Sequence, residues 1–262
     1  MEPQPVPGTT ELVRFLAGTR AVRAVVLTGS RAQGRAGPDA DVDLFVYADA
    51  DLTDQRREVV STLADRDAPV LVDVDPFGRG DVWRDRGDDT WMDVLYWSPG
   101  WAEEQLDRVI VRHEAQLGYS TAFWRSIATG VPLYERDGWH PTLQERARAP
   151  YPDELTDAVV GKNLPWLGGH PFSFRVQIEK AVDRGDAVSA NHRLAAWLAC
   201  YFDVIFAANR VLHPGEKRQI AVAEEECRRL PPGFRAGIEA LLEGPDPRPH
   251  LDRLLAALGP LL

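Results

Sequence analysis

The hydrophobic and polar positions change their period near residue 99. Before that point, short apolar runs of strand length lie between polar turns, at residues 25–27, 42–46, 69–75 and 90–96. Amphipathic stretches of helical length cover residues 10–17 and 51–64. Strand-length runs that alternate with amphipathic stretches predict a mixed α/β domain. Residues 76–89 are rich in Gly, Asp and Arg, which predicts a loop or a hairpin connection.

After residue 99 the apolar spacing becomes helical, beginning with residues 103–111. The clearest helix covers residues 188–211, and the sequence His213, Pro214, Gly215 ends it. Three further helices are expected, from about residue 216, over residues 234–242 and over residues 247–258.

Residues 132–138 interrupt this helical half, because they are predicted to be extended and to end in a turn. The pattern as a whole predicts an α/β mixed (α+β) fold. A small domain with a mixed β-sheet would cover residues 1–112, and a helical C-terminal domain would cover residues 113–262.

The turn after the first predicted strand has the composition of a phosphate-binding loop. Residues 25–27 are β-branched or apolar and lead into Thr28, Gly29 and Ser30. Glycine lets the backbone approach an anion closely, and a hydroxyl together with free N–H groups at a helix start can donate hydrogen bonds to it. Gly29 and Ser30 are therefore candidates for contacts with a triphosphate.

Two carboxylates follow this turn in the next predicted strand. Asp41 and Asp43 alternate with apolar residues, so at a strand period of two both side chains leave the same face. Carboxylates on one face repel each other unless a cation joins them, and Mg²⁺ takes one or two carboxylates together with phosphate and water. A pair of this kind on its own is usually a solvated strand edge. Asp39 follows Gly37 and Pro38 and fits a turn better than a metal site.

The Gly-Ser turn and the Asp pair together, ten residues apart and between apolar residues, resemble the nucleotidyltransferases of the DNA polymerase β superfamily. The resemblance is specific over residues 22–47. Three later segments are similar to nucleotidyltransferase-domain proteins related to bacterial antibiotic (aminoglycoside and lincosamide) adenylyltransferases: residues 118–124, 177–181 and 213–218.

This resemblance implies an in-line attack of an acceptor hydroxyl on the α-phosphorus of a nucleoside triphosphate, with pyrophosphate leaving. The choice of ATP as the co-substrate rests on this resemblance alone. Asp41 and Asp43 would hold one or two Mg²⁺ ions, and a third carboxylate on a neighbouring strand would act as a metal ligand, a general base or both. Asp93, a lone carboxylate among apolar strand residues, is the preferred candidate, and Asp73 is the alternative. Asp75 precedes Pro76 and fits a turn cap better.

Three cationic residues are candidates for the remaining triphosphate contacts. Arg31 directly follows Gly29 and Ser30, and the resemblance suggests that Lys180 or Lys217 completes the phosphate site. Each of the three could equally be a solvated surface cation. The acceptor could meet Gln177, Glu179 or Asp203 if their helices faced the site. A nucleobase or an acceptor ring could stack on an aromatic residue, although core packing is the usual role of such residues. The aromatic candidates are Trp91, Tyr96, Trp97, Trp101, Phe123 and Trp124.

Net charge and composition narrow the range of expected binding partners and the expected location of the protein. The net charge of −10 disfavours a nucleic acid and favours a small, cationic acceptor. Cys200 and Cys227 have no metal or disulfide spacing, no apolar run is long enough for a membrane span, and the start lacks a signal-peptide pattern, so a cytoplasmic protein is expected. The apolar residues 251–258 would suit a homodimer interface as well as a core.

Four functions agree with these observations. The first is transfer of AMP to a small molecule such as an aminoglycoside-like antibiotic, with a role in antibiotic resistance. The second is modification of a protein or tRNA, for example AMP transfer to a toxin, although that class often consists of little more than the first domain. The third is nucleotide binding without catalysis, which intact Asp41 and Asp43 disfavour. The fourth, a polymerase, would need a basic template groove.

Overall fold

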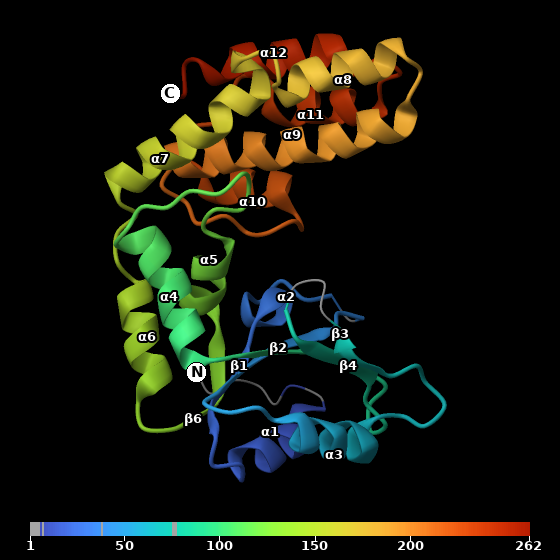
Figure 1. Ribbon diagram of the computed structural model, residues 1–262, viewed down its shortest axis with the longest axis vertical. Helices are drawn as coiled ribbons and strands as arrows, with labels where there is room; N and C mark the ends of the chain where they lie inside the picture. Colours follow the sequence, from blue (N-terminus) through green and yellow to red (C-terminus); the bar gives the residue numbers. More distant parts are fainter. Residues whose placement is uncertain (1–5, 7, 38, 75–77) are drawn as a thin grey trace. The chain divides into compact units, whose positions relative to one another are not determined.

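The computed structural model describes residues 6, 8–37, 39–74 and 78–262 (Figure 1). Contacts divide the chain into two compact units. The first unit contains residues 1–106 and 126–149, and the second contains residues 107–125 and 150–262. Asp75 lies outside the described residues, so its predicted turn role has no structural counterpart here.

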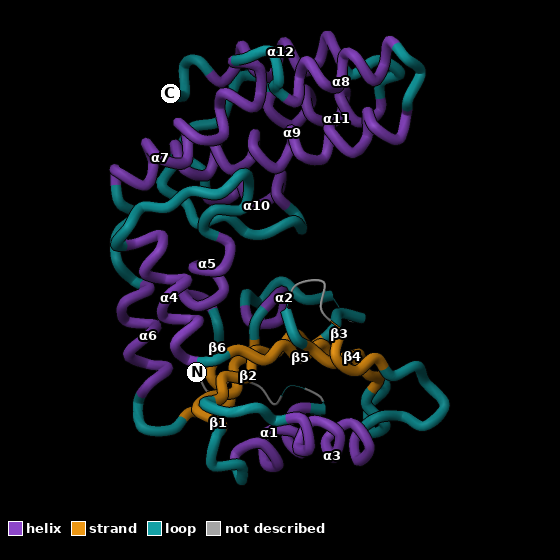
Figure 2. The backbone as a smooth tube through the Cα atoms, viewed as in Figure 1, coloured by secondary structure: helices purple, strands orange, loops and turns teal. Residues whose placement is uncertain are grey.

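The first unit is built on one mixed sheet, which Figure 2 shows as a single layer of strands. Its order is β3-β4-β5-β2-β1-β6, and β2 and β5 are parallel while the other neighbouring strands are antiparallel. The strands are β1 (Val22–Leu27), β2 (Val42–Ala48), β3 (Leu71–Val74), β4 (Gly80–Arg84), β5 (Trp91–Trp97) and β6 (Val131–Glu135). The predicted mixed α/β fold class is confirmed.

Helices α1 (Thr9–Ala17) and α3 (Thr53–Leu63) cover one face of this sheet. Val42, Leu44 and Val46 of β2 point to that face and are buried, and the residues between them, Asp43 and Phe45, are half-buried on the opposite face. Burying each large aliphatic side chain contributes roughly 1.5–3 kcal/mol, so the alternation fixes which face carries the polar groups. The sheet therefore presents Asp43 on the face away from α1 and α3.

Two strands differ from the sequence prediction. β4 (Gly80–Arg84) forms within residues 76–89, where a loop or hairpin connection is predicted, because Asp81 and Trp83 supply a buried face opposite Val82 and Arg84. β6 (Val131–Glu135) is extended as predicted, but it pairs with β1 in the first unit.

The two units consequently do not follow the predicted boundary at residue 112. Residues 126–149, which include β6 and α6 (Trp139–Ala147), belong to the first unit. There, Trp139 Nε1 donates a hydrogen bond to Glu103 Oε1 of α4 (Pro99–Ile110) at 2.7 Å, and the Trp139 ring lies 5.0 Å from that of Tyr47. The chain thus returns to the sheet after α4.

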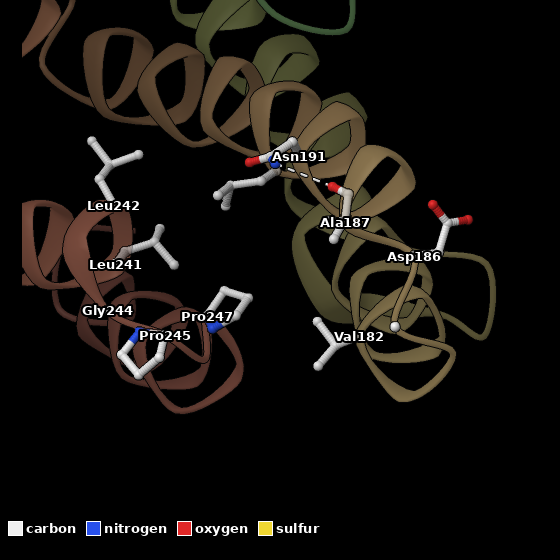
Figure 3. Close-up of a pocket in the computed structure, with 12 residues that line it drawn as sticks. Val182, Asp186, Ala187, Asn191, Leu241, Leu242, Gly244, Pro245 and Pro247 are labelled. Carbon is white, nitrogen blue, oxygen red and sulfur yellow. Dashed lines mark hydrogen bonds between the residues drawn. The ribbon is translucent and has the colours of Figure 1, made fainter.

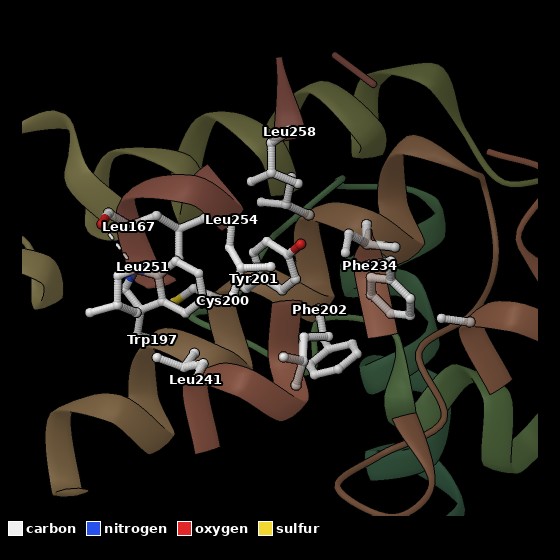
Figure 4. Packing of buried hydrophobic residues seen from close by; sticks show 14 of the residues in the cluster. Leu167, Trp197, Cys200, Tyr201, Phe202, Phe234, Leu241, Leu251, Leu254 and Leu258 are labelled. Atoms are coloured by element: carbon white, nitrogen blue, oxygen red, sulfur yellow. Dashed lines mark hydrogen bonds between the residues drawn. The ribbon is translucent and has the colours of Figure 1, made fainter. Parts of the chain in front are cut away.

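The second unit is helical. Its helices are α7 (Asp153–Leu164), the π-helical turn η1 (Pro165–Gly169), α8 (Phe174–Asp183), α9 (Ala187–Ala208), α10 (Gln219–Glu226), α11 (Phe234–Glu243) and α12 (Arg248–Leu258). α5 (Ala122–Thr129) begins in this unit and ends in the first. α9 supplies the largest share of the core, which also takes in Leu251 and Leu258 of α12 (Figure 4). Among its aromatic residues, Trp197 stacks on Tyr201 at 5.0 Å. None of the helices in the described part of the chain is long and apolar enough to cross a membrane.

Asp203 is part of this core and supports a loop of the same unit. Its carboxylate accepts hydrogen bonds from Ser120 N at 3.1 Å, Ser120 Oγ at 2.6 Å and Asn163 Nδ2 at 3.2 Å. The side chain is 2% exposed, and burial raises its pKa to about 6. The structure does not support the suggested contact between Asp203 and an acceptor, because the carboxylate is buried and already hydrogen-bonded.

Candidate active site

The turn after β1 brings backbone and carboxylate into direct contact. α2 (Gly29–Ala32) starts at Gly29, whose φ of 63° is in the left-handed region that favours glycine. A Cβ atom at this position would lie 1.9 Å from Asp43 Oδ2. Thr28 N also donates a hydrogen bond to the Asp43 carbonyl oxygen at 2.8 Å. Gly29 is therefore required both by its backbone angle and by the carboxylate that lies against it.

Asp43 and Asp93 are neighbours across the sheet. In the parallel pair of β2 and β5, Asp43 is in register with Asp93, and both residues are half-buried. Directly paired residues point to the same face, so the two carboxylates leave the sheet side by side. They leave it on the face away from α1 and α3, next to Gly29. The structure therefore brings together the Gly-Ser turn, Asp43 and the preferred third carboxylate.

Arg31 holds the segment that carries Asp41. Its Nε donates to the carbonyl oxygens of Asp41 at 3.0 Å and Ala40 at 3.2 Å, and its Nη2 donates to the Ala40 carbonyl oxygen at 2.5 Å. Asp41 itself precedes the first residue of β2 and is half-buried. The guanidinium of Arg31 thus fixes the backbone at the start of β2. Its predicted contact with a phosphate stays a prediction.

Asp73, the alternative third carboxylate, takes part in a different network. It lies on the edge strand β3, which β4 separates from β5, and has a φ of 59° at a register shift. Its Oδ1 lies 2.9 Å from Arg56 Nη1 and 2.8 Å from Arg79 Nε. These hydrogen bonds, that of Arg79 first, hold the pKa of Asp73 below its ordinary value. The position of Asp93 beside Asp43 supports Asp93 over Asp73.

The described residues contain no group of three or more His, Cys, Asp and Glu side chains arranged to hold a metal ion. A preformed cage is not what Mg²⁺ requires, because this ion usually binds through one or two carboxylates together with substrate phosphates and water. Asp43 and Asp93 supply two hard oxygen ligands at adjacent positions on one face. This donor set fits Mg²⁺ delivered with a triphosphate.

The remaining predicted site residues belong to the second unit. Lys180 is exposed on α8, and Lys217 is exposed in the segment before α10. Their proposed phosphate contacts stay predictions. His213 is buried, its Nδ1 accepts a hydrogen bond from Gly215 N at 3.0 Å, and burial lowers its pKa to about 3. His213 is therefore a buried, hydrogen-bonded structural residue.

Two pockets lie elsewhere. One of about 320 Å³ in the first unit is lined by Asp51, Arg79 and Tyr96, towards the ends of β2 and β5 that are remote from Asp43 and Asp93. The other, of about 310 Å³, lies between the start of α9 and the turn after α11 (Figure 3). Its walls combine apolar residues with Asp186 and Asn191, and the carboxylate of Asp186 caps α9 by accepting a hydrogen bond from Ser189 N. Neither pocket is lined by the carboxylates of the candidate site.

Sequence reasoning did not identify Val82 and Leu71, which extend the same row of the sheet beyond Asp93. Val82 lies on β4, the strand that the sequence did not predict. Residues 80–84 carry no clear apolar alternation in the sequence, because one of the buried positions of this strand is the charged Asp81.

Comparison with known proteins identifies the domain that contains this turn. Residues 10–86 match the family model described as a nucleotidyltransferase domain, which confirms the resemblance predicted over residues 22–47. Asp93 lies beyond the matched residues. Among solved structures, a nucleotidyltransferase-like protein from Exiguobacterium sibiricum 255-15 is similar at 13% identity, with 97% of this chain and 73% of that chain covered and a TM-score of 0.47. No curated protein matches the chain.

Proposed function

Because residues 10–86 match the nucleotidyltransferase domain, we propose that the chain transfers a nucleoside monophosphate from a nucleoside triphosphate to a hydroxyl of a small molecule. ATP is the first candidate for the triphosphate. The observation that carries the proposal is the register of Asp43 with Asp93, next to Gly29. It supports a site where two carboxylates and a phosphate-binding turn meet on one sheet face.

Each group has a distinct task in the proposed transfer. The Gly29–Ser30 turn would bind the phosphates that leave, and Asp41, Asp43 and Asp93 would hold Mg²⁺. When bound, Mg²⁺ neutralises the charge that develops on the phosphoryl oxygens. Arg31 holds the carbonyl groups of Ala40 and Asp41 and so positions the Asp41 backbone.

The covalent step is a single displacement. The acceptor oxygen forms a bond to the α-phosphorus while the bond from that phosphorus to the bridging oxygen of the β-phosphate breaks. The electron pair of the broken bond leaves with pyrophosphate. The proton of the acceptor hydroxyl passes to the Asp93 carboxylate, which must come within about 3 Å of it. The products are the nucleotidylated acceptor and pyrophosphate.

The acidic balance of the chain supports a cationic acceptor. A net charge of −10 favours the approach of an amine and disfavours a polyanion such as tRNA. Aminoglycoside-like antibiotics are therefore the first acceptor class to examine, and a role in antibiotic resistance would follow from that substrate. Lys180 and Lys217 are proposed as further phosphate contacts on the resemblance of residues 177–181 and 213–218 alone.

The proposal is tested by pyrophosphate release from the purified chain with Mg²⁺, each of the four ribonucleoside triphosphates and a panel of aminoglycosides, lincosamides and other hydroxylated amines. We expect release that needs one triphosphate, one acceptor class and Mg²⁺, and that Asp43→Asn abolishes. Release that is equal in the folded Asp43→Asn variant would refute the proposed site. Triphosphate binding without release for any small acceptor would favour a protein or tRNA acceptor, or a non-catalytic role.

A further inference from the structure

One row of paired positions runs across the sheet face that carries the carboxylates. Asp93 is in register with Asp43 on one side and is paired with Val82 of β4 on the other. Val82 is paired in turn with Leu71 of β3. Because directly paired residues share a face, the row reads Asp43, Asp93, Val82, Leu71, and Gly29 lies against Asp43 at its polar end. It passes from a phosphate-binding turn, through two carboxylates, to apolar side chains.

The apolar end of this row is exposed. Leu71 is 53% exposed, Val82 is half-buried, and Trp91, two residues before Asp93 on β5, is 41% exposed. Met92 is buried on the opposite face, so the pleat places Trp91 on the face of Asp93. Exposed apolar side chains that gather beside a polar site are a recurrent feature of ligand-binding surfaces.

If the proposed function holds, the direction of this row indicates on which side of the phosphorus the acceptor binds. In an in-line displacement, the attacking and the leaving oxygen lie on opposite sides of the phosphorus. With pyrophosphate at the Gly29–Ser30 turn and the phosphorus at the carboxylates, the acceptor lies on the side of Asp93 that faces β4 and β3. The acceptor therefore meets Trp91, Val82 and Leu71.

We propose that the acceptor carries a planar apolar ring next to its reacting hydroxyl, and that this ring stacks on Trp91 and lies against Val82 and Leu71. An indole offers a large flat face, and ring stacking adds to the gain from burying apolar surface. Asp93 takes the adjacent polar group of the acceptor. Among hydroxylated amines, the site thus selects those that bear a ring of this kind. This narrows the acceptor class of the proposed function and places aminoglycosides, which are wholly polar polyols, behind ring-bearing amines.

Binding to the whole protein, with Mg²⁺ and α,β-methylene-ATP present, tests the inference without the need for turnover. The probes are 2-amino-1-phenylethanol and 1-amino-2-propanol, which share the amine and the hydroxyl and differ by the ring. We expect the phenyl probe to bind about tenfold more tightly. Trp91→Ala should remove most of this difference in affinity, and Trp91→Phe should keep it. Leu71→Ala should weaken the binding of the phenyl probe about threefold.

Val72→Ala is the matched control. Val72 is 45% exposed on the same edge strand, but it is paired with buried Asp81 and points to the opposite face. It should leave the affinity for both probes unchanged. Equal affinity for the two probes, no binding of either, or a loss with Val72→Ala as large as with Trp91→Ala would overturn the inference.

Kinetics separate this inference from the proposed function. With any acceptor found in the release assay, Trp91→Ala should raise KM for the acceptor about tenfold and leave KM for the triphosphate unchanged. A rise in KM for the triphosphate instead would assign Trp91 to the nucleobase and overturn the inference. Ring-dependent probe binding without Asp43-dependent release would sustain the ring site and refute the transfer reaction.

Discussion

Gly29, Ser30, Asp41 and Asp43 could be proposed as candidate site residues from the sequence because everything that singles them out is local. Their spacing and the strand period place a glycine turn and two carboxylates at consecutive strand ends. The task of Arg31 could not be predicted, because its hydrogen bonds go to carbonyl oxygens nine and ten positions later, whose place depends on the whole loop. Local sequence thus gives the candidate groups, and long-range geometry shows which residues hold them in place.

Gly29→Ala tests whether the close contact between this turn and Asp43 matters for transfer. A Cβ atom would meet Asp43 Oδ2 at 1.9 Å, so the carboxylate must move by an ångström or more. A displacement of that size in a catalytic group can lower the rate by about 100-fold. We expect a loss of this order in kcat for pyrophosphate release, with the fold retained by circular dichroism.

Gly34→Ala is the matched control. Gly34 has a φ of 66°, close to the 63° of Gly29, but no atom lies within 4 Å of its added Cβ. Both substitutions carry the strain of a left-handed residue, about 1 kcal/mol, so only the contact with Asp43 differs. Equal rates for the two variants would show that this contact has no part in catalysis.

At the scale of elements, the sequence located α1, α3, β2 and β5 but not β4. The long amphipathic and apolar segments have periods that show in one sequence, whereas β4 is short and buries Asp81. The Asp81 carboxylate accepts a hydrogen bond from Arg56 Nε at 2.8 Å and lies 2.5 Å from Arg56 Nη2. The Arg56 guanidinium also lies 4.5 Å from the centre of the Tyr96 ring. A strand that is held by a buried ion pair has no hydrophobic signature to predict it.

Arg56→Ala tests whether this pair holds α3 on the sheet. Arg56 is 2% exposed and Asp81 is fully buried, so the substitution leaves an uncompensated charge inside the protein. We expect the free energy of unfolding to fall by about 3 kcal/mol in chemical denaturation. Arg79→Ala, which breaks ion pairs of Asp73 and Asp51 at the surface, should change it little. Similar losses in the two variants would contradict a special role of the buried pair.

At the scale of the whole molecule, the change from an α/β half to a helical half was predictable, and the partition into units was not. The apolar pattern of residues 132–138 predicts an extended segment, but no local signal tells that it pairs with β1, more than 100 residues earlier. Asp93 shows the same limit, because its register with Asp43 follows only from the parallel pairing of β2 with β5.

Acid should destabilise the folded protein through buried histidines. His140 is fully buried in the first unit, and burial lowers its pKa to about 4 from an ordinary 6.5. As pH falls through 6.5, the unfolded chain takes up a proton that folded His140 does not, so the stability present above 6.5 is lost down to about 4. One such group contributes of the order of 2 kcal/mol between pH 7.5 and 4.5.

His140→Phe should therefore reduce the loss of unfolding free energy between pH 7.5 and 4.5, as measured by denaturation at each pH. His192→Gln, which replaces an exposed histidine of α9, should leave the pH dependence as in the wild type. If His140→Phe kept the full dependence, buried His140 would not be its source.

The side-by-side placement of Asp43 and Asp93 is the central claim, and the rate of Mg²⁺-dependent pyrophosphate release from Asp43→Asn, Asp93→Asn and Asp73→Asn variants tests it most directly. Loss of a group that stabilises the developing charge should lower the rate by at least about 100-fold in the first two. Asp73→Asn, which alters only the network of Arg56 and Arg79, should stay within about threefold of the wild type. A folded Asp93→Asn variant with the wild-type rate, or an Asp73→Asn variant as inactive as Asp43→Asn, would contradict the assignment.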